Sequence, residues 1–327
     1  MSTSPKLSVV FSFRNEAEVL AELVRRMQTV LRQEIGKGGL ASYELIFVND
    51  ASSDQSLSVL LEHKKADNAI RILNMSRPFG VSPCVMAGLE HSTGDVVAYM
   101  DADLQDPPEV IPDLLDAWRK QGVDVVHTVR RRRKGESSFK LWLTRLGYAI
   151  LHRTASIRLP VEAGDFKLLS RRAVNHLVRL REHQPFTRGL VCWIGFPSAI
   201  VYYDREPRFA GTTKFAIFSP SVINNFLESA LISFSAAPLK IAVLMGFLSI
   251  FVDLALLAHV LSEKFQGKAI PGWTAIMLAI IFIGSMQFFC IGIIGLYVNS
   301  IFLESKARPN YIIESSHGFV TQQEQGV

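Results

Sequence analysis

The chain has little cysteine, and none of it has the spacing of a metal or disulfide framework. Its 327 residues include Cys84, Cys192 and Cys290, an odd number with no CxxC pair. Zinc ribbons and disulfide scaffolds need cysteines paired at short spacing. We therefore expect three packing residues in a chain that folds in a reducing compartment.

Two glycine-rich phosphate signatures are also missing. No GxGxxG follows the first apolar run, and no GxxxxGK[ST] occurs anywhere. Dinucleotide oxidoreductases and P-loop NTPases depend on these loops, so a nucleotide here would have to be held by carboxylates, a metal ion and basic side chains. The formal net charge of +5 suits an anionic membrane surface. Because no RNA- or DNA-binding motif accompanies it, we expect no nucleic-acid partner.

A secretory leader is not evident at the start of the sequence. The segment Met1–Lys6 is short and polar, and Leu7–Phe13 is too brief for the apolar region of a signal peptide. The sequence therefore predicts that the N-terminal region stays in the cytosol.

Apolar residues, by contrast, make up 49% of the chain, and they concentrate near its C-terminal end. The run Thr274–Val298 has no charged residue, and about 20 apolar residues cross a bilayer as a helix. The run Ile241–Leu261 is of similar length but carries Asp253, so a buried core helix is the alternative there. We predict two antiparallel transmembrane helices, with Asp253 paired locally rather than serving transport.

Two spans would return the chain to its starting side. The N-terminal region and the tail with Lys306 and Arg308 would then share one face, which the positive-inside rule makes cytoplasmic.

The first 130 residues alternate between strand-like and helix-like patterns, which predicts a mostly parallel sheet with crossover helices. The expected strands are Leu7–Phe13, Tyr43–Val48, Ile70–Leu73, Val96–Met100 and Val123–Val129. The expected helices are Glu16–Leu31, Asp54–Lys65, Val81–His91 and Pro107–Gln121.

Acidic side chains follow two of these strands. Asp101 and Asp103 come directly after the fourth strand, and Asp50 closes the second. Ligands of open α/β sheets bind outside the carboxyl ends of the strands, where paired carboxylates can share a divalent cation with a nucleotide. The alternative is a polar turn that caps the next helix.

Asp106 and Glu109 fit such a cap. Asp106 would be the N-cap, Pro107 and Pro108 would occupy the first helical positions, and Glu109 would close a capping box. This cap leaves Asp101 and Asp103 unexplained, which favours metal binding for that pair.

Two stretches have apolar residues at helical spacing, Ser137–Arg153 and Pro220–Phe234. Each would lie in the membrane interface or pack on the core, and the second favours the interface because it leads into the first predicted span. The basic run Arg130–Lys134 is typical of a solvated or lipid-attracted surface, and binding of a lipid phosphate by one of its arginines is the alternative.

Together these residues resemble glycosyltransferase family 2, and within it the polyprenyl-phosphate glycosyltransferases. That group includes GtrB-like bacterial glucosyltransferases, aminoarabinose transferases and dolichyl-phosphate mannose synthases. The resemblance covers nearly the whole chain. The motifs that carry it are Asn15-Glu16, Val48-Asn49-Asp50, Asp101-Ala102-Asp103-Leu104-Gln105-Asp106-Pro107-Pro108-Glu109, Gly164-Asp165-Phe166 and Gly211-Thr212-Thr213-Lys214-Phe215.

The resemblance implies an α/β fold of GT-A type that binds a nucleotide sugar, and it implies roles for individual residues. Asp165 would lie near the reacting centre, as a base or as an orienting group. The other implied roles are donor binding by Glu16, Asp50, Asp101, Arg205 and Lys214, coordination of Mg²⁺ or Mn²⁺ by Asp101, Asp103 and Gln105, and binding of the acceptor phosphate by Arg130 and Arg131.

The implied reaction is inverting transfer of a hexose to a membrane polyprenyl phosphate, with UDP-glucose and undecaprenyl phosphate as the favoured substrates. The site would face the cytoplasm at a bacterial inner membrane, and a homo-oligomer is compatible with this arrangement. A processive polysaccharide synthase is an alternative, but none of the four tryptophans follows an arginine as its QxxRW motif requires. A catalytically silent scaffold that binds nucleotide sugar is another.

The expected organisation follows from these assignments. It comprises a catalytic domain over 1–215, an amphipathic helix over 216–238, a span over 239–261, a linker over 262–273, a second span over 274–300 and a cytoplasmic tail over 301–327.

Overall fold

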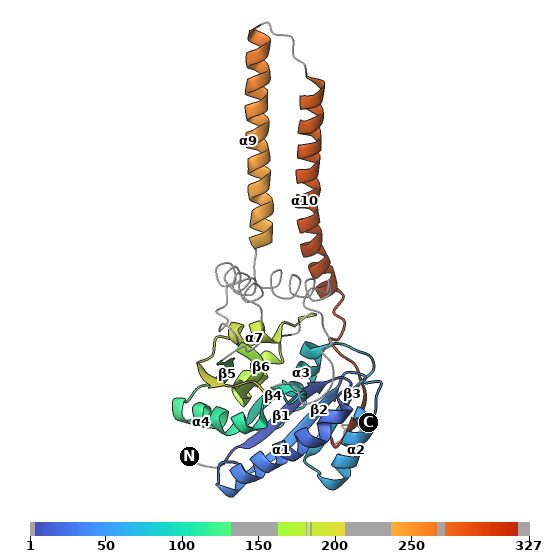
Figure 1. The fold of residues 1–327 in the computed structure, drawn as a ribbon, viewed down its shortest axis with the longest axis vertical. Helices are drawn as coiled ribbons and strands as arrows, with labels where there is room; N and C mark the ends of the chain where they lie inside the picture. Colours follow the sequence, from blue (N-terminus) through green and yellow to red (C-terminus); the bar gives the residue numbers. More distant parts are fainter. Residues whose placement is uncertain are drawn as a thin grey trace, which may run out of the picture. The chain divides into compact units, whose positions relative to one another are not determined.

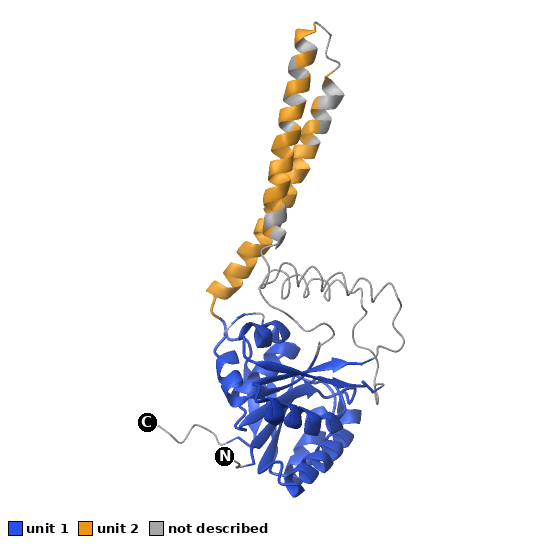
Figure 2. Ribbon diagram, turned by 90° about the vertical axis from the view of Figure 1, so that its left-hand side faces the viewer, with its two compact units in different colours: residues 1–148, 157–216, 308–327 blue, residues 149–156, 217–307 orange. Residues whose placement is uncertain are grey.

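The structure, a computed structural model, describes residues 4–131, 163–180, 182–183, 185–206, 237–266 and 272–319. It divides into two compact units, one of residues 1–148, 157–216 and 308–327 and one of residues 149–156 and 217–307 (Figure 2). Both predicted amphipathic helices lie outside the described residues, as do Lys214 and the basic run beyond Arg131.

The first unit is built on an eight-stranded sheet with the order β7-β5-β6-β4-β1-β2-β3-β8 (Figure 1). Strands β1 to β5 and β7 share one direction, whereas β6 and β8 run antiparallel to their neighbours. The strands are β1 Lys6–Phe13, β2 Ser42–Asn49, β3 Ile70–Met75, β4 Val96–Asp101, β5 Val125–Arg130, β6 Ala163–Ser170, β7 Ser198–Tyr203 and β8 Ile313–His317. The predicted mostly parallel sheet is confirmed.

The central strands are apolar on both sides because both faces of the sheet are covered. Val9, Val10 and Phe11 are consecutive residues of β1, and all three are fully buried. Successive strand residues point to opposite faces, so burial of all three requires a layer on each side. On one face, the ring of Phe11 stacks on that of Phe47 with centroids 4.7 Å apart.

The helices form these two layers. On one side α1 contacts α2 and α4, and on the other α3 contacts α6 and α7. Helix α3 approaches the sheet closely because Gly88 has no side chain, and a Cβ there would lie 2.2 Å from Val10 Cγ1. The helices are α1 Ala17–Gly36, α2 Ser56–Ala66, α3 Val81–Glu90, the 3₁₀ helix η1 Pro108–Val110, α4 Ile111–Gln121, α6 Arg171–Leu177 and α7 Thr187–Trp193.

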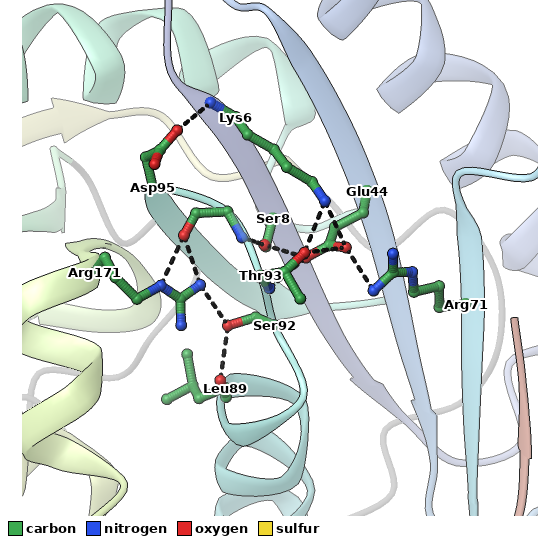
Figure 3. A network of polar contacts seen from close by, with 10 residues as sticks. Lys6, Ser8, Glu44, Arg71, Leu89, Ser92, Thr93, Asp95 and Arg171 are labelled. Carbon is green, nitrogen blue, oxygen red and sulfur yellow. Dashed lines mark hydrogen bonds and ion pairs between the residues drawn. The ribbon is translucent and has the colours of Figure 1, made fainter. Parts of the chain in front are cut away.

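The amino ends of the central strands are joined by a buried carboxylate (Figure 3). Glu44 of β2 accepts hydrogen bonds from Ser8 Oγ at 2.5 Å and from the Thr93 backbone N–H at 2.7 Å. Its Oε2 lies 2.8 Å from Arg71 Nη1 and 3.3 Å from Lys6 Nζ. Because these partners come from different strands and the loop before β4, Glu44 stabilises the sheet at the amino ends of its strands, away from their carboxyl ends.

Among the residues that the structure describes, the second unit contains α9 Ala237–Phe265 and α10 Trp273–Ser305, which contact each other. Within the described residues, one segment, Phe282–Ser305, is long and apolar enough to cross a membrane, and Ala242–Val252 is a shorter apolar helix. One candidate span is therefore present, and the second span remains a prediction.

Candidate active site

Asp50 and Asp101, which the sequence predicts to share one crevice, do lie at the carboxyl ends of strands in the middle of the sheet. Strand β1 pairs with β2 on one side and β4 on the other, with Phe13 opposite Asn49 and Ser12 opposite Asp101. Asp50 follows Asn49 directly. Asp50 and Asp101 therefore flank the carboxyl end of β1, as the sequence predicted.

Asp50 organises the loop that precedes α3. Its carboxylate accepts hydrogen bonds from the backbone N–H groups of Phe79 at 2.6 Å and Gly80 at 3.1 Å. Gly80 has a φ of 96°, a conformation that side chains disfavour. Burial, together with the Asp50 charge and a hydrogen bond to it, raises the pKa of the Cys84 thiol. Cys84 is thus a neutral packing residue beside the loop.

Glu16 lies at the same end of the strands, in the turn after β1. The preceding residue Asn15 is fastened to the loop after Asp50, because its backbone N–H donates to Ser52 Oγ at 2.9 Å. The Glu16 N–H donates to Ser56 Oγ at 3.0 Å. Glu16 is 8% exposed. These bonds hold Glu16 next to the loop that carries Asp50.

Four carboxyl groups gather around the end of β4. Burial, and then the negative charges of Asp165, Asp103 and Asp106, raise the pKa of Asp101 to about 7. Like charges in a poorly solvated site disfavour ionisation, and a divalent cation would relieve that repulsion. Carboxylate oxygens are the ligands that Mg²⁺ and Mn²⁺ prefer, so the chemistry of the Asp101 and Asp103 pair fits the predicted ion.

Gln105, the third predicted metal ligand, follows a tight turn. Leu104 adopts a φ of 56°, and the Gln105 N–H donates to Asp103 Oδ1 at 3.1 Å. The Gln105 carbonyl in turn accepts from the Glu206 N–H at 3.0 Å, which fixes the chain beside Arg205. Over the part of the chain that the structure describes, no group of three or more His, Cys, Asp or Glu side chains is arranged as a metal site.

Asp165 is paired with a residue that the sequence did not suggest. Arg188 of α7 donates from Nε to Asp165 Oδ1 at 2.6 Å and from Nη2 to Oδ2. Burial by itself raises the pKa of Asp165, but Arg188, through its charge and hydrogen bonds, and then Lys167 and Arg130 lower it to about 2. Asp165 is therefore ionised. No local pattern links it to Arg188, because the two lie on a strand and a helix 23 residues apart.

The predicted cap by Asp106 and Glu109 is wrong. The N-cap position of η1 is Pro107, with no capping side chain. Asp106 is 1% exposed, accepts a hydrogen bond from the Tyr203 hydroxyl and has its Oδ1 3.4 Å from Arg205 Nε. Glu109 pairs with Arg26 at 2.6 Å instead of closing a capping box. A carboxylate this deeply buried needs polar or charged partners, which outweigh a local cap.

Tyr203 links Asp106 to the predicted acceptor-binding arginine. Arg130 and Tyr203 are opposite each other in the β5–β7 pair, and Arg130 Nε lies 3.4 Å from the Tyr203 hydroxyl. Burial and the nearby Asp106 charge raise the pKa of Tyr203 to about 12, so its hydroxyl stays protonated and donates. The Arg131 backbone N–H donates to the Tyr203 carbonyl at 2.9 Å, and the Arg131 side chain is exposed. Arg130 and Arg205 are thus brought together around Asp106.

Comparison with known proteins identifies the class. Residues 8–178 match the family Glycosyl transferase family 2. The chain is 36% identical over 314 residues to an uncharacterised glycosyltransferase of Synechocystis, covering 96% of both chains. It is 31% identical over 316 residues to the SfII prophage-derived bactoprenol glucosyl transferase of Shigella flexneri, covering 95% of this chain and 98% of that one. The chain belongs to glycosyl transferase family 2, and its α/β fold with a mostly parallel sheet is GT-A-like.

A solved structure also matches part of the chain. The crystal structure of glucosyl-3-phosphoglycerate synthase from Mycobacterium tuberculosis in complex with Mn²⁺, UDP-glucose and phosphoglyceric acid matches with a TM-score of 0.45 and 19% identity. The match covers 68% of this chain and 79% of that one.

Proposed function

We propose that this glycosyltransferase moves glucose from UDP-glucose to undecaprenyl phosphate at the cytoplasmic face of a bacterial inner membrane. The single observation that carries the proposal is the set of acidic groups at the carboxyl end of β4, flanked by arginines. Asp101, Asp103 and Asp165 supply the negative charge, and Arg188 and Arg130 supply the positive charge. Such a site suits a metal-bound diphosphate on one side and a phosphate acceptor on the other. The similarity to bactoprenol glucosyl transferases along almost the whole chain supports the lipid acceptor.

The donor would lie along the ends of β1, β2 and β4. Glu16 and Asp50 are proposed to contact the nucleoside, with Arg205 and Lys214 near the phosphates. Asp101, Asp103 and Gln105 would hold Mg²⁺ or Mn²⁺, which as a Lewis acid neutralises the charge that develops on the departing diphosphate.

The proposed chemistry is a single displacement. An oxygen of the acceptor phosphate forms a bond to the anomeric carbon, and the bond from that carbon to the diphosphate oxygen breaks, with its electron pair leaving on the nucleoside diphosphate. The configuration at the anomeric carbon inverts. A phosphate monoester, whose second pKa is about 6, is largely ionised at neutral pH and needs little help from a base.

Asp165 therefore has an orienting role in this proposal rather than that of a general base. The pKa of Asp165 is lowered to about 2, so its carboxylate is a weak proton acceptor at neutral pH. Its charge would instead orient Arg188 and the groups beside it. Arg130 and Arg131 are proposed to bind the acceptor phosphate as charge-assisted hydrogen-bond donors.

Membrane anchoring completes the proposal. Helix α10 contains the candidate span, and α9 would be the second, with the catalytic domain over 1–215 on the cytoplasmic side. Anchoring next to the acceptor would raise the rate of encounter with its phosphate and restrict its orientation.

The test is transfer of label into lipid. The purified full-length protein in detergent is incubated with radiolabelled nucleotide sugars, undecaprenyl phosphate and Mn²⁺ or Mg²⁺, and the label in the organic phase is counted. We expect label from UDP-glucose alone, abolished by EDTA and by Asp103→Asn. Transfer that persists in Asp103→Asn would reject the metal assignment, and no transfer from any donor would reject the proposed reaction.

A further inference from the structure

The segment after α10 returns to the sheet and forms its edge strand. Strand β8 pairs antiparallel with β3, with Ile72 opposite His317 and Asn74 opposite Ser315. The register shifts between Asn74 and Met75, which marks an irregularity at the carboxyl end of β3. This end of β3 lies beside the end of β2, because Asn49 is the residue opposite Asn74 on that strand. The C-terminal segment that follows α10 therefore reaches the carboxyl ends of β3 and β2, beside which the nucleoside site is proposed.

At the irregularity, three side chains form a chain of hydrogen bonds toward that site. Asn74 Nδ2 donates to Glu314 Oε2 at 2.7 Å. Asn49 Nδ2 donates to Asn74 Oδ1 at 2.8 Å. Asn49 Oδ1 then accepts from the Ser52 backbone N–H at 3.1 Å. Asn49 and Asn74 are 1% and 8% exposed, so neither amide has ready access to water as an alternative partner.

The direction of this chain is set by its carboxylate. Glu314 Oε2 accepts a hydrogen bond from Asn74, so Asn74 presents its NH₂ group to Glu314 and its oxygen to Asn49. Asn49 must in turn use its NH₂ group toward Asn74, which leaves its oxygen for the Ser52 N–H. The Glu314 acceptor at one end thus selects the amide orientation of both asparagines.

The loop at the other end is the one that carries Asp50. Asn49 precedes Asp50, and Ala51 adopts a φ of 50°, a backbone conformation that needs support from its neighbours. The bond from Ser52 to Asn49 closes the turn around these residues. The turn after Asp50 is therefore connected by hydrogen bonds to the C-terminal segment.

We propose that Glu314 is a positioning residue for donor binding, acting through Asn74 and Asn49 on the loop that holds Asp50. This inference rests on the proposed function for its choice of ligand, a nucleoside diphosphate. Further contacts keep the segment in place: the Ser76 N–H donates to the Ile312 carbonyl at 3.0 Å, and Asn310 Nδ2 donates to the Glu182 carbonyl at 2.6 Å. Glu314 therefore does not act as the sole anchor of β8, and its replacement should leave the strand paired.

The test uses Glu314→Lys in the full-length protein. A lysine places a donor against the Asn74 NH₂ group, which favours reversal of the Asn74 amide and then of the Asn49 amide. The Ser52 N–H would then face an NH₂ group and lose its acceptor. Glu314→Ala removes the carboxylate without adding a donor, and Glu314→Gln keeps an acceptor oxygen and should restore normal behaviour. Glu62→Lys makes the same charge change at an exposed position of α2 and is the matched control.

Three quantities are measured: KM and kcat for UDP-glucose, the affinity for UDP with Mn²⁺ by calorimetry, and hydrogen exchange of the Ser52 amide in the ligand-free protein. For Glu314→Lys we expect KM and the UDP dissociation constant to rise about tenfold, kcat to stay within about twofold and Ser52 to exchange faster. Wild-type KM, or wild-type exchange at Ser52, in this variant overturns the proposal.

The exchange measurement separates this inference from the proposed reaction. If the unaltered protein neither binds UDP with Mn²⁺ nor transfers sugar, the proposed function fails. Faster exchange at Ser52 in Glu314→Lys, with normal exchange in Glu314→Gln, would still support the hydrogen-bond chain in that case.

Discussion

Arg188 donates two hydrogen bonds to the two carboxylate oxygens of Asp165, and this guanidinium group contributes more than Lys167 or Arg130 to lowering the pKa of Asp165. Asp101, in contrast, lies among the negative charges of Asp165, Asp103 and Asp106, which together with burial raise its pKa. One carboxylate at the end of β4 is thus paired with an arginine, and Asp101 and Asp103 are the ones we propose as ligands of a cation.

Removal of Arg188 should therefore damage catalysis more than folding. In Arg188→Ala, Asp165 loses its partner and adds repulsion to Asp101, and we expect kcat to fall by about a hundredfold. Arg188→Lys keeps the charge but loses the paired geometry, so its loss should be smaller. Transfer of labelled glucose to lipid measures both.

The control for that variant is another arginine that pairs with an aspartate. Arg172 of α6 bonds to Asp124 and is more exposed, with 61% of its side chain accessible. Arg172→Ala should leave kcat within about twofold, because exposed ion pairs contribute little. A loss equal to that of Arg188→Ala would contradict a specific role for Arg188.

Tyr203 offers a test of the acceptor side. Tyr203→Phe removes the hydroxyl that joins Asp106 to Arg130, so Arg130 loses a fixed partner and Asp106 loses a buried hydrogen bond. We expect KM for the lipid acceptor to rise about tenfold and stability to fall by about 1–2 kcal/mol. Titration of undecaprenyl phosphate at saturating donor measures the first effect. Tyr202→Phe, at the exposed neighbouring residue, should match the unaltered protein.

Glu44 provides the opposite case, a residue that should matter for stability alone. Glu44→Ala leaves Lys6 and Arg71 without their buried partner and removes the acceptor from Ser8 and Thr93. We expect about 2–4 kcal/mol of destabilisation in denaturant unfolding, with unchanged KM because Glu44 lies at the amino ends of the strands. Asp116→Ala breaks an exposed pair with Lys120 and should cost under about 1 kcal/mol. A changed KM in Glu44→Ala would show that the two ends of the strands are coupled.

His127 predicts how stability depends on pH. Burial, and then the nearby Lys167, lower the pKa of His127 to about 4 from its usual value of 6.5. The unfolded chain therefore binds a proton that the folded protein excludes, and stability rises with pH across this interval. Acidification from pH 7 to pH 4 should lower the free energy of unfolding by at most about 3 kcal/mol through this residue.

The measurement is the unfolding midpoint at a series of pH values. In His127→Gln, the pH dependence between about 4 and 6.5 should be shallower than in the unaltered protein. His63→Gln, on α2, should keep the original slope. An unchanged slope in His127→Gln would show that other groups dominate acid unfolding.

The parts predicted well are those that depend on local pattern. Every predicted strand and helix of the first 130 residues overlaps an observed one, since the period of apolar residues follows directly from burial of one or both faces. The position of Asp101 at a strand end was likewise predictable from the apolar run before it. Strand β8 was not predicted, because the five residues Ile313–His317 have little apolar pattern and form a strand only by pairing with the edge of β3.

The sequence by itself determined which chemistry is present: an acidic pair behind a buried strand, a basic run, and long apolar segments toward the C-terminal end. Only the tertiary structure decided the partners. In the structure, Asp106 contacts Tyr203 and Arg205 instead of capping a helix, and Asp165 pairs with Arg188. Glu314 is connected by hydrogen bonds to the loop after β2. Each of these contacts joins residues that lie apart in the chain. Where the groups are buried, as Asp106 is, pairing away from water becomes necessary only once the fold has formed.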